Sequence, residues 1–318
     1  MEEKTEIMKF VNQSSKRITG ENIIDIIADA AHSCYNVEPK DHENNLKFVT
    51  NLRKIHHLST VEHGVVYFQI NNAYLGDQYN TLYSFKCAKF INSFSYGDTR
   101  YFSMSLRPLI EYYDNNRNDD GEYIPLLEAF IKALDDENYT LITGHKKIVH
   151  EDIDDLVHPV VKNITAEYVS YLPIEIRRNI EYYQCRVITD RAIANEFERH
   201  RMFSYLQSST RYINYSKEKN GAELCFIKPV DYEENKGIYD ETFSLIEKNY
   251  LKLTSENKSR PENARDILPC ALSTQLNITG VRNQWEHVFE LRTAKDAHPK
   301  IQELCNIIKK DFYDDFID

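Results

Sequence analysis

Apolar positions recur at helical spacing in several parts of the chain. The pattern is clear in residues 22–32, 44–56, 125–134 and within 231–258, where apolar side chains every three or four positions share one face. Pro125 suits the first turn of the third stretch. We therefore predict a helix in each stretch, with its apolar face packed against the core.

Strand-like segments lie between these helices. β-branched and aromatic residues are concentrated in the second half of residues 57–70, in residues 180–189 and in residues 223–227. A short helix is expected after the second strand, from Asp190 to Glu198, because Asp190 can act as its N-cap. We expect an α+β fold in which a mixed or antiparallel sheet is flanked by helices.

Prolines mark the helix starts that we predict in the carboxy-terminal third. Pro261 suits the first turn of a helix that carries Arg265, and Pro269 is expected to begin the next helix, which ends near Gly280. A final pair of helices follows, with a break at residues 298–299. This third of the chain is thus predicted to be helical.

One basic residue interrupts an apolar helix face in this region. Trp285, Val288, Phe289 and Arg292 share one side of the predicted helix. Because burying an unpaired charge is costly, Arg292 needs a partner or must reach water. An ordinary buried ion pair and an arginine that extends to solvent are both consistent with the pattern.

The composition is that of a soluble, acidic chain. The 318 residues suffice for one large domain or two smaller ones, and the mean hydropathy is −0.57. No apolar run approaches the length of a membrane span, and residues 1–6 lack the features of a secretion signal, so we expect a cytoplasmic protein without a membrane partner. The net charge of −11 argues against binding nucleic acid by general electrostatics.

The cysteines and histidines give no metal-binding pattern. Six cysteines are scattered without any C-x-x-C pair, which argues against a zinc site and a disulfide framework. Ser59 stands where the H-x-x-E-H protease motif, suggested by Glu62 and His63, requires histidine. We therefore expect no metal, and buried, reduced thiols. The cysteines are Cys34, Cys87, Cys185, Cys225, Cys270 and Cys305.

Side chains that can bind an anion or take part in catalysis are most concentrated in residues 199–212. This segment contains three arginines, a histidine and several hydroxyl groups. We expect the Ser/Gln/Thr-rich part to be non-repetitive, with N–H groups and hydroxyls that can hold a phosphate or a pyrimidine edge. Arg211 would close this site with its bidentate guanidinium. The alternative is a solvated helix end, in which Glu196 and Glu198 pair with arginines three residues further on.

These residues also resemble a known family. Arg-His-Arg at 199–201, seven further residues, Ser209 and then Thr-Arg-Tyr resemble the signature of the flavin-dependent thymidylate synthases, and residues 190–198 and 214–217 are similar to the same family. Ser-x-x-Glu-His at 59–63 resembles a family element near the flavin. Further segments resemble its long branch: residues 99–109, 265–269, 279–280, 285, 287, 291–292 and 297–299.

The resemblance implies reductive methylation of dUMP to dTMP, with 5,10-methylenetetrahydrofolate as carbon donor, FAD as redox carrier and NADPH as reductant. It also implies a homotetramer whose active sites draw on several subunits. In short family members the first strand leads almost directly into the Arg-His-Arg helix. Residues from about 72 to 178 are therefore expected to be a helix-rich insertion within a single domain, 1–318.

The resemblance also implies roles for individual residues. Arg292 would stabilise charge at uracil N3, and Ser209 would make a catalytic hydrogen bond beside the uracil. Arg199, Arg211 and Arg265 would hold the phosphate with N–H groups of residues 208–210. The dUMP-binding set is Glu196, Arg199, Gln207, Ser208, Ser209, Thr210, Arg211, Arg265 and Arg292. The FAD-binding set is Ser59, His63, Val65, Arg199, His200, Arg201, Gln207, Arg282, Asn283 and His287; short family members have Asn-x-Arg near the position of Arg282 and Asn283, so the chain departs from the pattern there.

Two other interpretations are open. Pro269-Cys270 looks like the nucleophile of the folate-only thymidylate synthases, although Ala271 stands where that family has histidine. Alternatively, a non-catalytic module would bind a nucleotide or single-stranded nucleic acid through the basic run and some of the 22 tyrosines. The acidic net charge weighs against this second interpretation.

Overall fold

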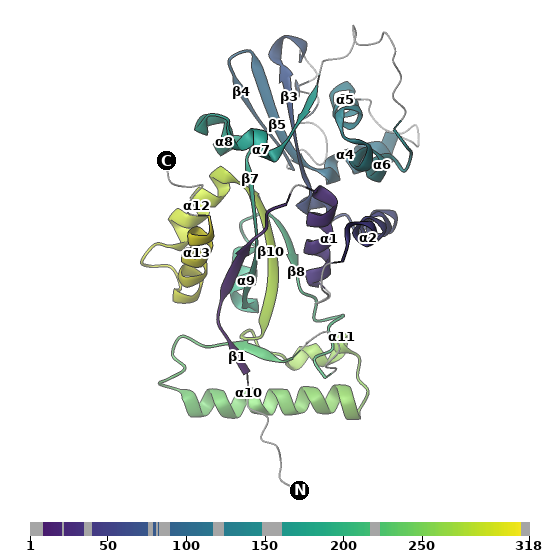
Figure 1. Ribbon diagram of the computed structural model, residues 1–318. Helices are drawn as coiled ribbons and strands as arrows, with labels where there is room; N and C mark the ends of the chain where they lie inside the picture. Colours follow the sequence, from purple (N-terminus) through teal and green to yellow (C-terminus); the bar gives the residue numbers. More distant parts are fainter. Residues whose placement is uncertain are drawn as a thin grey trace.

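The computed structural model describes residues 9–20, 22–34, 40–75, 79–80, 82, 90–116, 124–147, 161–216 and 223–312. Some residues for which the sequence led to a prediction lie outside these ranges. They are residues 1–6, Cys87 and Lys217. The described elements form three tiers, each built around its own sheet (Figure 1).

The central tier is an antiparallel sheet in the spatial order β2-β7-β10-β8. Strand β10 pairs with β7 along its whole length and with β8 on its other side, where Leu276 lies opposite Gln207. Alternate residues of β7 face opposite sides: Cys185 and Val187 join the core with α12 and α13, whereas Arg186 reaches Asp29 of α1. The elements of this tier are β2 (Ser14–Arg17), α1 (Ile23–Cys34), α2 (His42–Lys54), β7 (Tyr182–Asp190), α9 (Arg191–Phe197), β8 (Ser204–Gln207), β10 (Ser273–Val281), α12 (Arg282–Arg292) and α13 (Pro299–Asp311).

The upper tier contains a second antiparallel sheet, in the order β4-β5-β3-β6. Phe68 of β3 and Phe130 of α5 stack with ring centroids 4.5 Å apart, which ties the sheet to the helices that cover it. The elements are the 3-10 turn η1 (Val61–His63), β3 (Val65–Asn71), the 3-10 turn η2 (Asn72–Tyr74), β4 (Ile91–Tyr96), β5 (Thr99–Ser105), α4 (Leu106–Asn116), α5 (Pro125–Ala133), α6 (Asp136–Thr143), β6 (Lys162–Ile164), α7 (Ala166–Ser170) and α8 (Ile174–Ile180).

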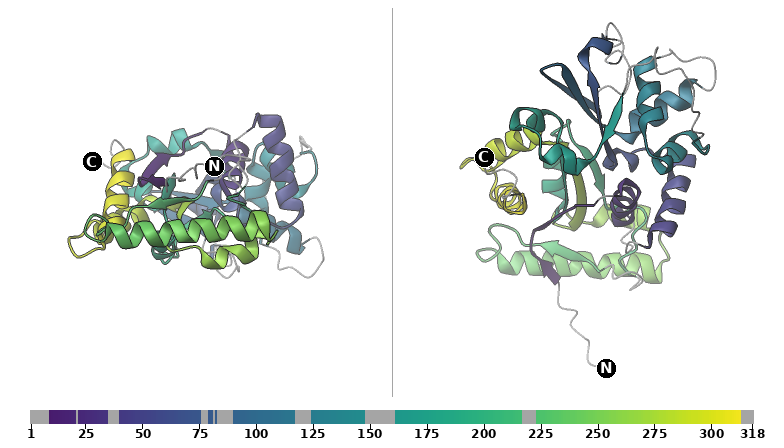
Figure 2. Two further views of the ribbon diagram at one scale, coloured as in Figure 1. Left: turned by 90° about the horizontal axis from the view of Figure 1, so that it is seen from below. Right: turned by 45° about the horizontal axis from the view of Figure 1, so that its top comes forward.

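The lower tier is a small layer beneath the central sheet, and the long helix α10 crosses it (Figures 1 and 2). Strands β1 and β9 form a parallel pair, and the rings of Phe226 and Phe243 stack 4.7 Å apart to attach α10 to them. The elements are β1 (Lys9–Val11), β9 (Cys225–Ile227), α10 (Lys236–Leu251), the π-helical turn Lys252–Glu256, α11 (Pro261–Ala264) and the 3-10 turn η7 (Arg265–Ile267).

The α+β expectation is confirmed, and both four-stranded sheets are antiparallel with helices packed against them. The described part of the region from about 72 to 178 contains three strands, β4 to β6, in addition to its helices. Strands β5 and β6 pair with β3, and β4 pairs with β5, so β3 belongs to the upper sheet and not to the central one. Among the described residues, no helix has the length and apolar character to cross a bilayer.

The predicted helix from Pro269 to Gly280 is wrong. Residues Ser273–Val281 form β10, one of the two inner strands of the central sheet, and Pro269 lies in a turn in which its carbonyl accepts the N–H of Leu272 at 3.0 Å. The strand is rich in threonine, isoleucine and valine, which pack well on a pleated surface. Pro269 alone suggested the start of a helix. The segment that follows it forms a strand instead, because it pairs with β7 on one side and with β8 on the other.

The expectation of buried thiols holds for most of the described cysteines. Cys34, Cys185 and Cys305 are buried, and burial raises the pKa of the Cys34 thiol to about 12. Cys225 is half-buried, whereas Cys270 is exposed, because it lies in the turn before β10. The described residues contain no disulfide and no cluster of metal-ligating side chains.

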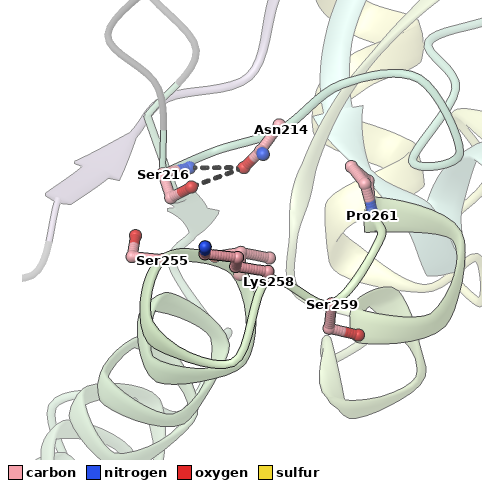
Figure 3. Close-up of a pocket in the computed structure, with 7 residues that line it drawn as sticks. Asn214, Ser216, Ser255, Lys258, Ser259 and Pro261 are labelled. Carbon is pink, nitrogen blue, oxygen red and sulfur yellow. Dashed lines mark hydrogen bonds between the residues drawn. The ribbon is translucent and has the colours of Figure 1, made fainter.

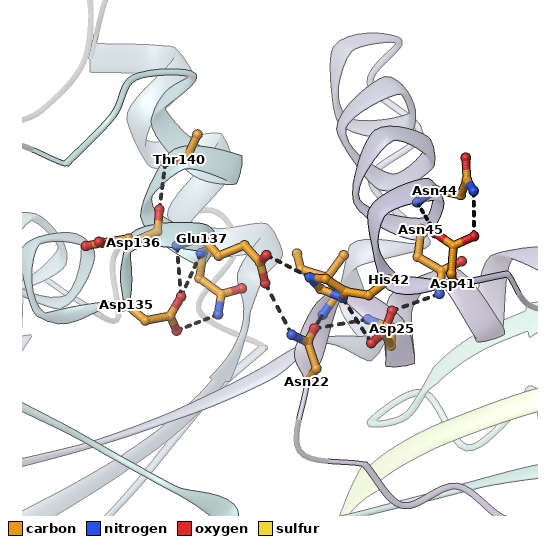
Figure 4. A network of polar contacts seen from close by, with 12 residues as sticks. Asn22, Asp25, Asp41, His42, Asn44, Asn45, Asp135, Asp136, Glu137 and Thr140 are labelled. Carbon is orange, nitrogen blue, oxygen red and sulfur yellow. Dashed lines mark hydrogen bonds and ion pairs between the residues drawn. The ribbon is translucent and has the colours of Figure 1, made fainter.

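An exposed histidine joins the lower helices of the upper tier to those of the central tier. His42, at the start of α2, contacts Asp25 of α1 through Nδ1 at 3.0 Å and Glu137 of α6 through Nε2 at 2.8 Å (Figure 4). Asn22 also donates to Glu137, at 3.2 Å. Ionised carboxylates only accept hydrogen bonds, so both contacts are made fully when both ring nitrogens carry a proton. Glu137 and Asp25 accordingly raise the pKa of His42.

Replacing His42 with glutamine is expected to lower the melting temperature more at pH 5.5 than at pH 9. A pKa that is raised in the folded state means that protonated His42 stabilises the fold below its ordinary pKa of 6.5, and that this contribution is lost as the pH rises through the folded-state value. Thermal unfolding of both proteins at the two pH values measures the effect. His145→Gln, at an exposed site, is the control. Equal losses at both pH values would contradict the proposed ion pairing.

Candidate functional site

The turn at residues 199–201 is anchored on the central sheet. Helix α9 begins where β7 ends, with Asp190 as the predicted N-cap: its Oδ1 atom accepts the N–H of Ile193 at 2.8 Å. The helix ends at Phe197, whose buried ring packs against Trp285 of α12. The two arginines and the histidine therefore lie in a short turn between a capped helix and strand β8.

The next segment is more regular than expected, because β8 occupies Ser204–Gln207 and irregular structure begins only at Ser208. The Ser208 N–H donates to the Gln275 carbonyl at 2.9 Å, and the Ser209 N–H donates to the Cys34 carbonyl at 3.2 Å. Two of the three N–H groups that we expected to hold a phosphate are thus used inside the chain. The reason is that β10 and α1 pack directly against this loop.

Arg292 brings the carboxy-terminal helix α12 into contact with this turn. Its Nε–H donates to Nε2 of His200 at 3.0 Å, and its Nη1 donates to Oε1 of Glu196, a residue 96 positions away, at 2.5 Å. Trp285 and Phe289 on the same helix face are buried. The predicted apolar stripe is therefore present, and its arginine finds the ion-pair partner that burial requires.

This arginine also lines an open pocket of about 440 Å³ next to the turn. The wall of the pocket comes from the end of α12 and the turn that follows it. It includes the carboxylates of Glu290 and Asp296 and the imidazole of His287. The lining residues are His287, Glu290, Leu291, Arg292, Ala294, Asp296 and Ala297. Arg292 is thus held by the chain on one side and open to a small molecule on the other.

The arginines that we expected to hold the phosphate, Arg199, Arg211 and Arg265, are all exposed. A second pocket, of about 530 Å³, lies between the segment that follows Arg211 and the segment that precedes Arg265 (Figure 3). These two segments are therefore neighbours within one chain. The pocket is lined by Asn214, Ser216, Thr254, Ser255, Lys258, Ser259 and Pro261, so its polar groups are mainly hydroxyls.

His63 lies over the central sheet, although it belongs to the turn that leads into β3. Its Nδ1 atom is 2.7 Å from Oγ1 of Thr279, and Thr279 lies opposite Ser204 in the pairing of β10 with β8. His63 is buried, and burial lowers its pKa to about 4. Ser59 is half-buried in the turn before it, and Val65 packs against a small apolar cluster at the start of β3.

Arg282 occupies a different environment from the one we expected. It begins α12, is 1% exposed, and forms ion pairs with Glu286 at 3.2 Å and Glu181 at 3.8 Å. Its charge is thus compensated within the chain, as expected for a buried arginine. A contact between Arg282 and FAD stays a prediction. Asn283, the next residue, is half-buried, and His287, one turn further along α12, is exposed.

The sequence predictions missed Arg191. Its Nη2 donates to Oε1 of Gln207 at 3.2 Å and its Nη1 to the Ser208 carbonyl at 3.5 Å, so it positions two predicted dUMP-binding residues. A signal was available, because Arg191 lies in the first turn of α9, where the helix dipole disfavours a cation. A cation at that position suggests a specific partner.

Comparison with known proteins shows what the carboxy-terminal part of the chain is similar to. The family described as "Thymidylate synthase complementing protein" matches residues 179–316. A flavin-dependent thymidylate synthase of Pyrococcus furiosus is 31% identical over 118 residues, which are 36% of this chain and 47% of the relative. The enzyme of the same name from Mycobacterium avium is 27% identical over 126 residues, which are 36% of this chain and 50% of the relative. The chain thus spans about half the length of these curated relatives.

Solved structures are also similar to part of the chain. A flavin-dependent thymidylate synthase from Helicobacter pylori, complexed with FAD and dUMP, is 21% identical to it with a TM-score of 0.34. The match covers 41% of this chain and 67% of that one. The matched family region, residues 179–316, contains both the turn at 199–201 and Arg292. The part of the chain that is similar to the thymidylate synthase complementing protein family thus holds both contacts of the candidate site, the turn at 199–201 and Arg292.

Proposed function

We propose that this protein is an FAD-dependent thymidylate synthase, which methylates dUMP reductively to dTMP with 5,10-methylenetetrahydrofolate as carbon donor and NADPH as reductant. The contact of Arg292 with Glu196 and His200 carries the proposal, because it joins the two sequence blocks that resemble the family. The names of the curated relatives support it.

Three side chains of the predicted FAD-binding set have an unsatisfied polar atom that fits a ligand role. His63 Nε2, Gln207 Nε2 and Asn283 Oδ1 are each buried without a hydrogen-bond partner in the part of the chain that the structure describes. Leaving such an atom unpaired costs about 1–3 kcal/mol, so a cofactor or a second subunit that paired with it would stabilise the protein. Redox chemistry is what FAD supplies when bound, since no side chain can carry a hydride.

Arg292 is the group that we propose to activate the pyrimidine. Uracil C5 is a weak nucleophile, and it becomes stronger when negative charge on N3 is stabilised. A mostly buried guanidinium that is held in place does this well, because its charge is already oriented when negative charge develops. Ser209 is proposed to make a hydrogen bond beside the uracil. Glu196 and Gln207 would line the same nucleotide.

The phosphate is proposed to bind to exposed guanidinium groups, with each charged hydrogen bond contributing about 1.5–3 kcal/mol. Arg199, Arg211 and Arg265 are the candidates, together with Thr210. The hydroxyl of Ser208 donates to the Gln275 carbonyl at 3.1 Å and accepts the Gln275 N–H at 2.9 Å, so it is engaged within the chain. Because the N–H groups of Ser208 and Ser209 are engaged within the chain, the arginines carry most of this binding. We also propose a homotetramer in which several subunits contribute these arginines to each site.

Flavin absorption and tritium release test the proposed function. Purified protein, or protein reconstituted with FAD, is expected to be yellow and to bleach with NADPH. Release of tritium from dUMP labelled at C5 should require both NADPH and the folate. A colourless protein that cannot be reconstituted would favour the alternative, a non-catalytic nucleotide-binding or single-strand-binding module.

The same assay tests the rival role of Cys270. The thiol is exposed in the turn before β10, and the backbone carbonyl of Cys270 accepts the N–H of Arg191 at 3.0 Å. Cys270→Ser should keep the tritium release of the unmodified protein, because the proposed chemistry does not use a thiol. Complete loss of activity in a folded Cys270→Ser protein would instead favour the folate-only mechanism.

A further inference from the structure

Two contacts fix the guanidinium of Arg292 in one orientation. Its Nε–H donates to Nε2 of His200, with the two nitrogens 3.0 Å apart. One hydrogen of Nη1 is donated to Oε1 of Glu196, with the nitrogen and oxygen 2.5 Å apart. An arginine side chain has five N–H hydrogens in a rigid planar fork, so these contacts leave three, two of them on Nη2. Because one contact comes from the last turn of α9 and the other from the turn that follows it, the guanidinium cannot rotate freely about its side chain.

The contact with Arg292 determines the protonation of His200. Arginine has no acceptor atom, so the Nε2 atom of His200 must present its lone pair to the Nε–H of Arg292. The imidazole is therefore neutral, with its proton on Nδ1. A proton on Nε2 would place two N–H groups against each other, and the contact would break.

The surroundings keep His200 in place and neutral. The Tyr205 hydroxyl lies 2.9 Å from the His200 carbonyl, and the imidazole packs edge-on against Phe197 with ring centroids 5.8 Å apart. Burial lowers the pKa of His200 to about 4, and the charges of Arg292, His287 and Arg199 act in the same direction. The carboxylate of Glu196 pairs with Arg292.

We propose that His200 is a positioning residue for Arg292: its Nε2 lone pair, together with Glu196, aims the free edge of the guanidinium at the pyrimidine. This inference rests on the proposed function, and it assigns His200 a task besides the predicted contact with FAD. The neutral imidazole acts through Arg292 and need not touch the nucleotide. Loss of the acceptor should therefore weaken the action of Arg292 without removing its charge.

The first test needs no cofactor and no substrate. In protein with ¹⁵N-labelled histidine and without FAD, the His200 ring is expected to be neutral at pH 7, with Nδ1 protonated and Nε2 bare. In Arg292→Ala the pKa of His200 should rise, because a facing cation is removed, and the tautomer preference should weaken. Protonation of Nε2 in the unmodified protein would overturn the proposal, whatever the enzyme activity.

The second test is a double-mutant cycle in the FAD-loaded protein, read by tritium release from dUMP. His200→Ala should lower kcat by about 10- to 100-fold, as expected for loss of a hydrogen bond to a charged group. His200→Gln offers an amide oxygen near the position of Nε2 and should recover much of this loss. In the Arg292→Ala background, His200→Ala should have little further effect.

The outcomes separate the inference from the proposed function. Additive effects of the two alanine variants would show that His200 acts independently of Arg292, for example only through FAD, and would overturn the positioning role. A protein without any dUMP turnover would overturn the proposed function, while the NMR result would still decide the tautomer. His145→Gln, an exposed histidine far from these contacts in the sequence, should match the unmodified protein in both tests.

Discussion

Replacing Arg292 with alanine is expected to slow tritium release from C5 of dUMP by about 10²- to 10³-fold. This is the usual loss when a preorganised donor that stabilises developing charge is removed. Arg292 is mostly buried and held by two partners, so little reorganisation is needed when charge develops at N3. The rate at saturating dUMP, folate and NADPH measures the effect, because it reports the chemical steps more directly than the affinity does.

Two further variants make the Arg292 result specific. Arg292→Lys keeps the charge but loses the planar fork, and should fall between the alanine variant and the unmodified protein. Lys295→Ala removes an exposed cation three residues away and should have no effect. If Arg292→Ala were folded and as fast as the unmodified protein, Arg292 would not act on the pyrimidine, and the ion pair with Glu196 would be structural only.

Replacing Trp285 with alanine is expected to lower the free energy of unfolding by about 3–5 kcal/mol, the usual range for a buried aromatic residue. Trp285 is 0% exposed, and its ring lies 4.8 Å from Phe203 and 5.2 Å from Phe312. Its Nε1–H also donates to the Tyr183 carbonyl at 3.1 Å. One side chain thus joins α12 to α13, to β7 and to the segment after the 199–201 turn. Equilibrium unfolding in urea measures the loss.

The size and chemistry of Trp285 can be separated with a second substitution. Trp285→Phe keeps an aromatic ring and gives up the hydrogen bond and part of the volume, so its cost should be smaller. Ile238→Ala, on the exposed face of α10 at 67% exposure, should change stability by about 0.5 kcal/mol or less. A loss below about 1 kcal/mol for Trp285→Ala would mean that neighbouring rings refill the space.

Local signals in the sequence predicted many of the elements well. Asp190 caps α9 as expected, Pro125 and Pro261 lie in first helical turns, and helix α12 has the predicted apolar stripe. Caps, proline positions and helical periodicity depend on neighbours within a few residues, so they can be recognised in one sequence. Strand β10 was missed because its structure depends on two partners that are distant in the sequence, β7 and β8.

At the candidate site, too, local signals could be recognised in the sequence, whereas contacts between distant segments could not. An arginine on an apolar helix face signalled that Arg292 needed a partner, and the structure supplies Glu196 and His200. The sequence could not show that the N–H groups of Ser208 and Ser209 would be taken by residues of β10 and α1. Such competition for donors follows from tertiary packing, which periodicity and motifs do not encode.

Strand β10 passes into α12 without a connecting loop, since the strand ends at Val281 and the helix begins at Arg282. The directions in which the side chains of α12 point are therefore fixed by the position of each residue in β10. Deleting a single residue of β10 would move its side chains to the opposite faces of the sheet and would turn α12 by about 100° relative to it. Natural variation in chain length should accordingly be absent from this junction and accumulate in longer connections, such as the one between β8 and β9.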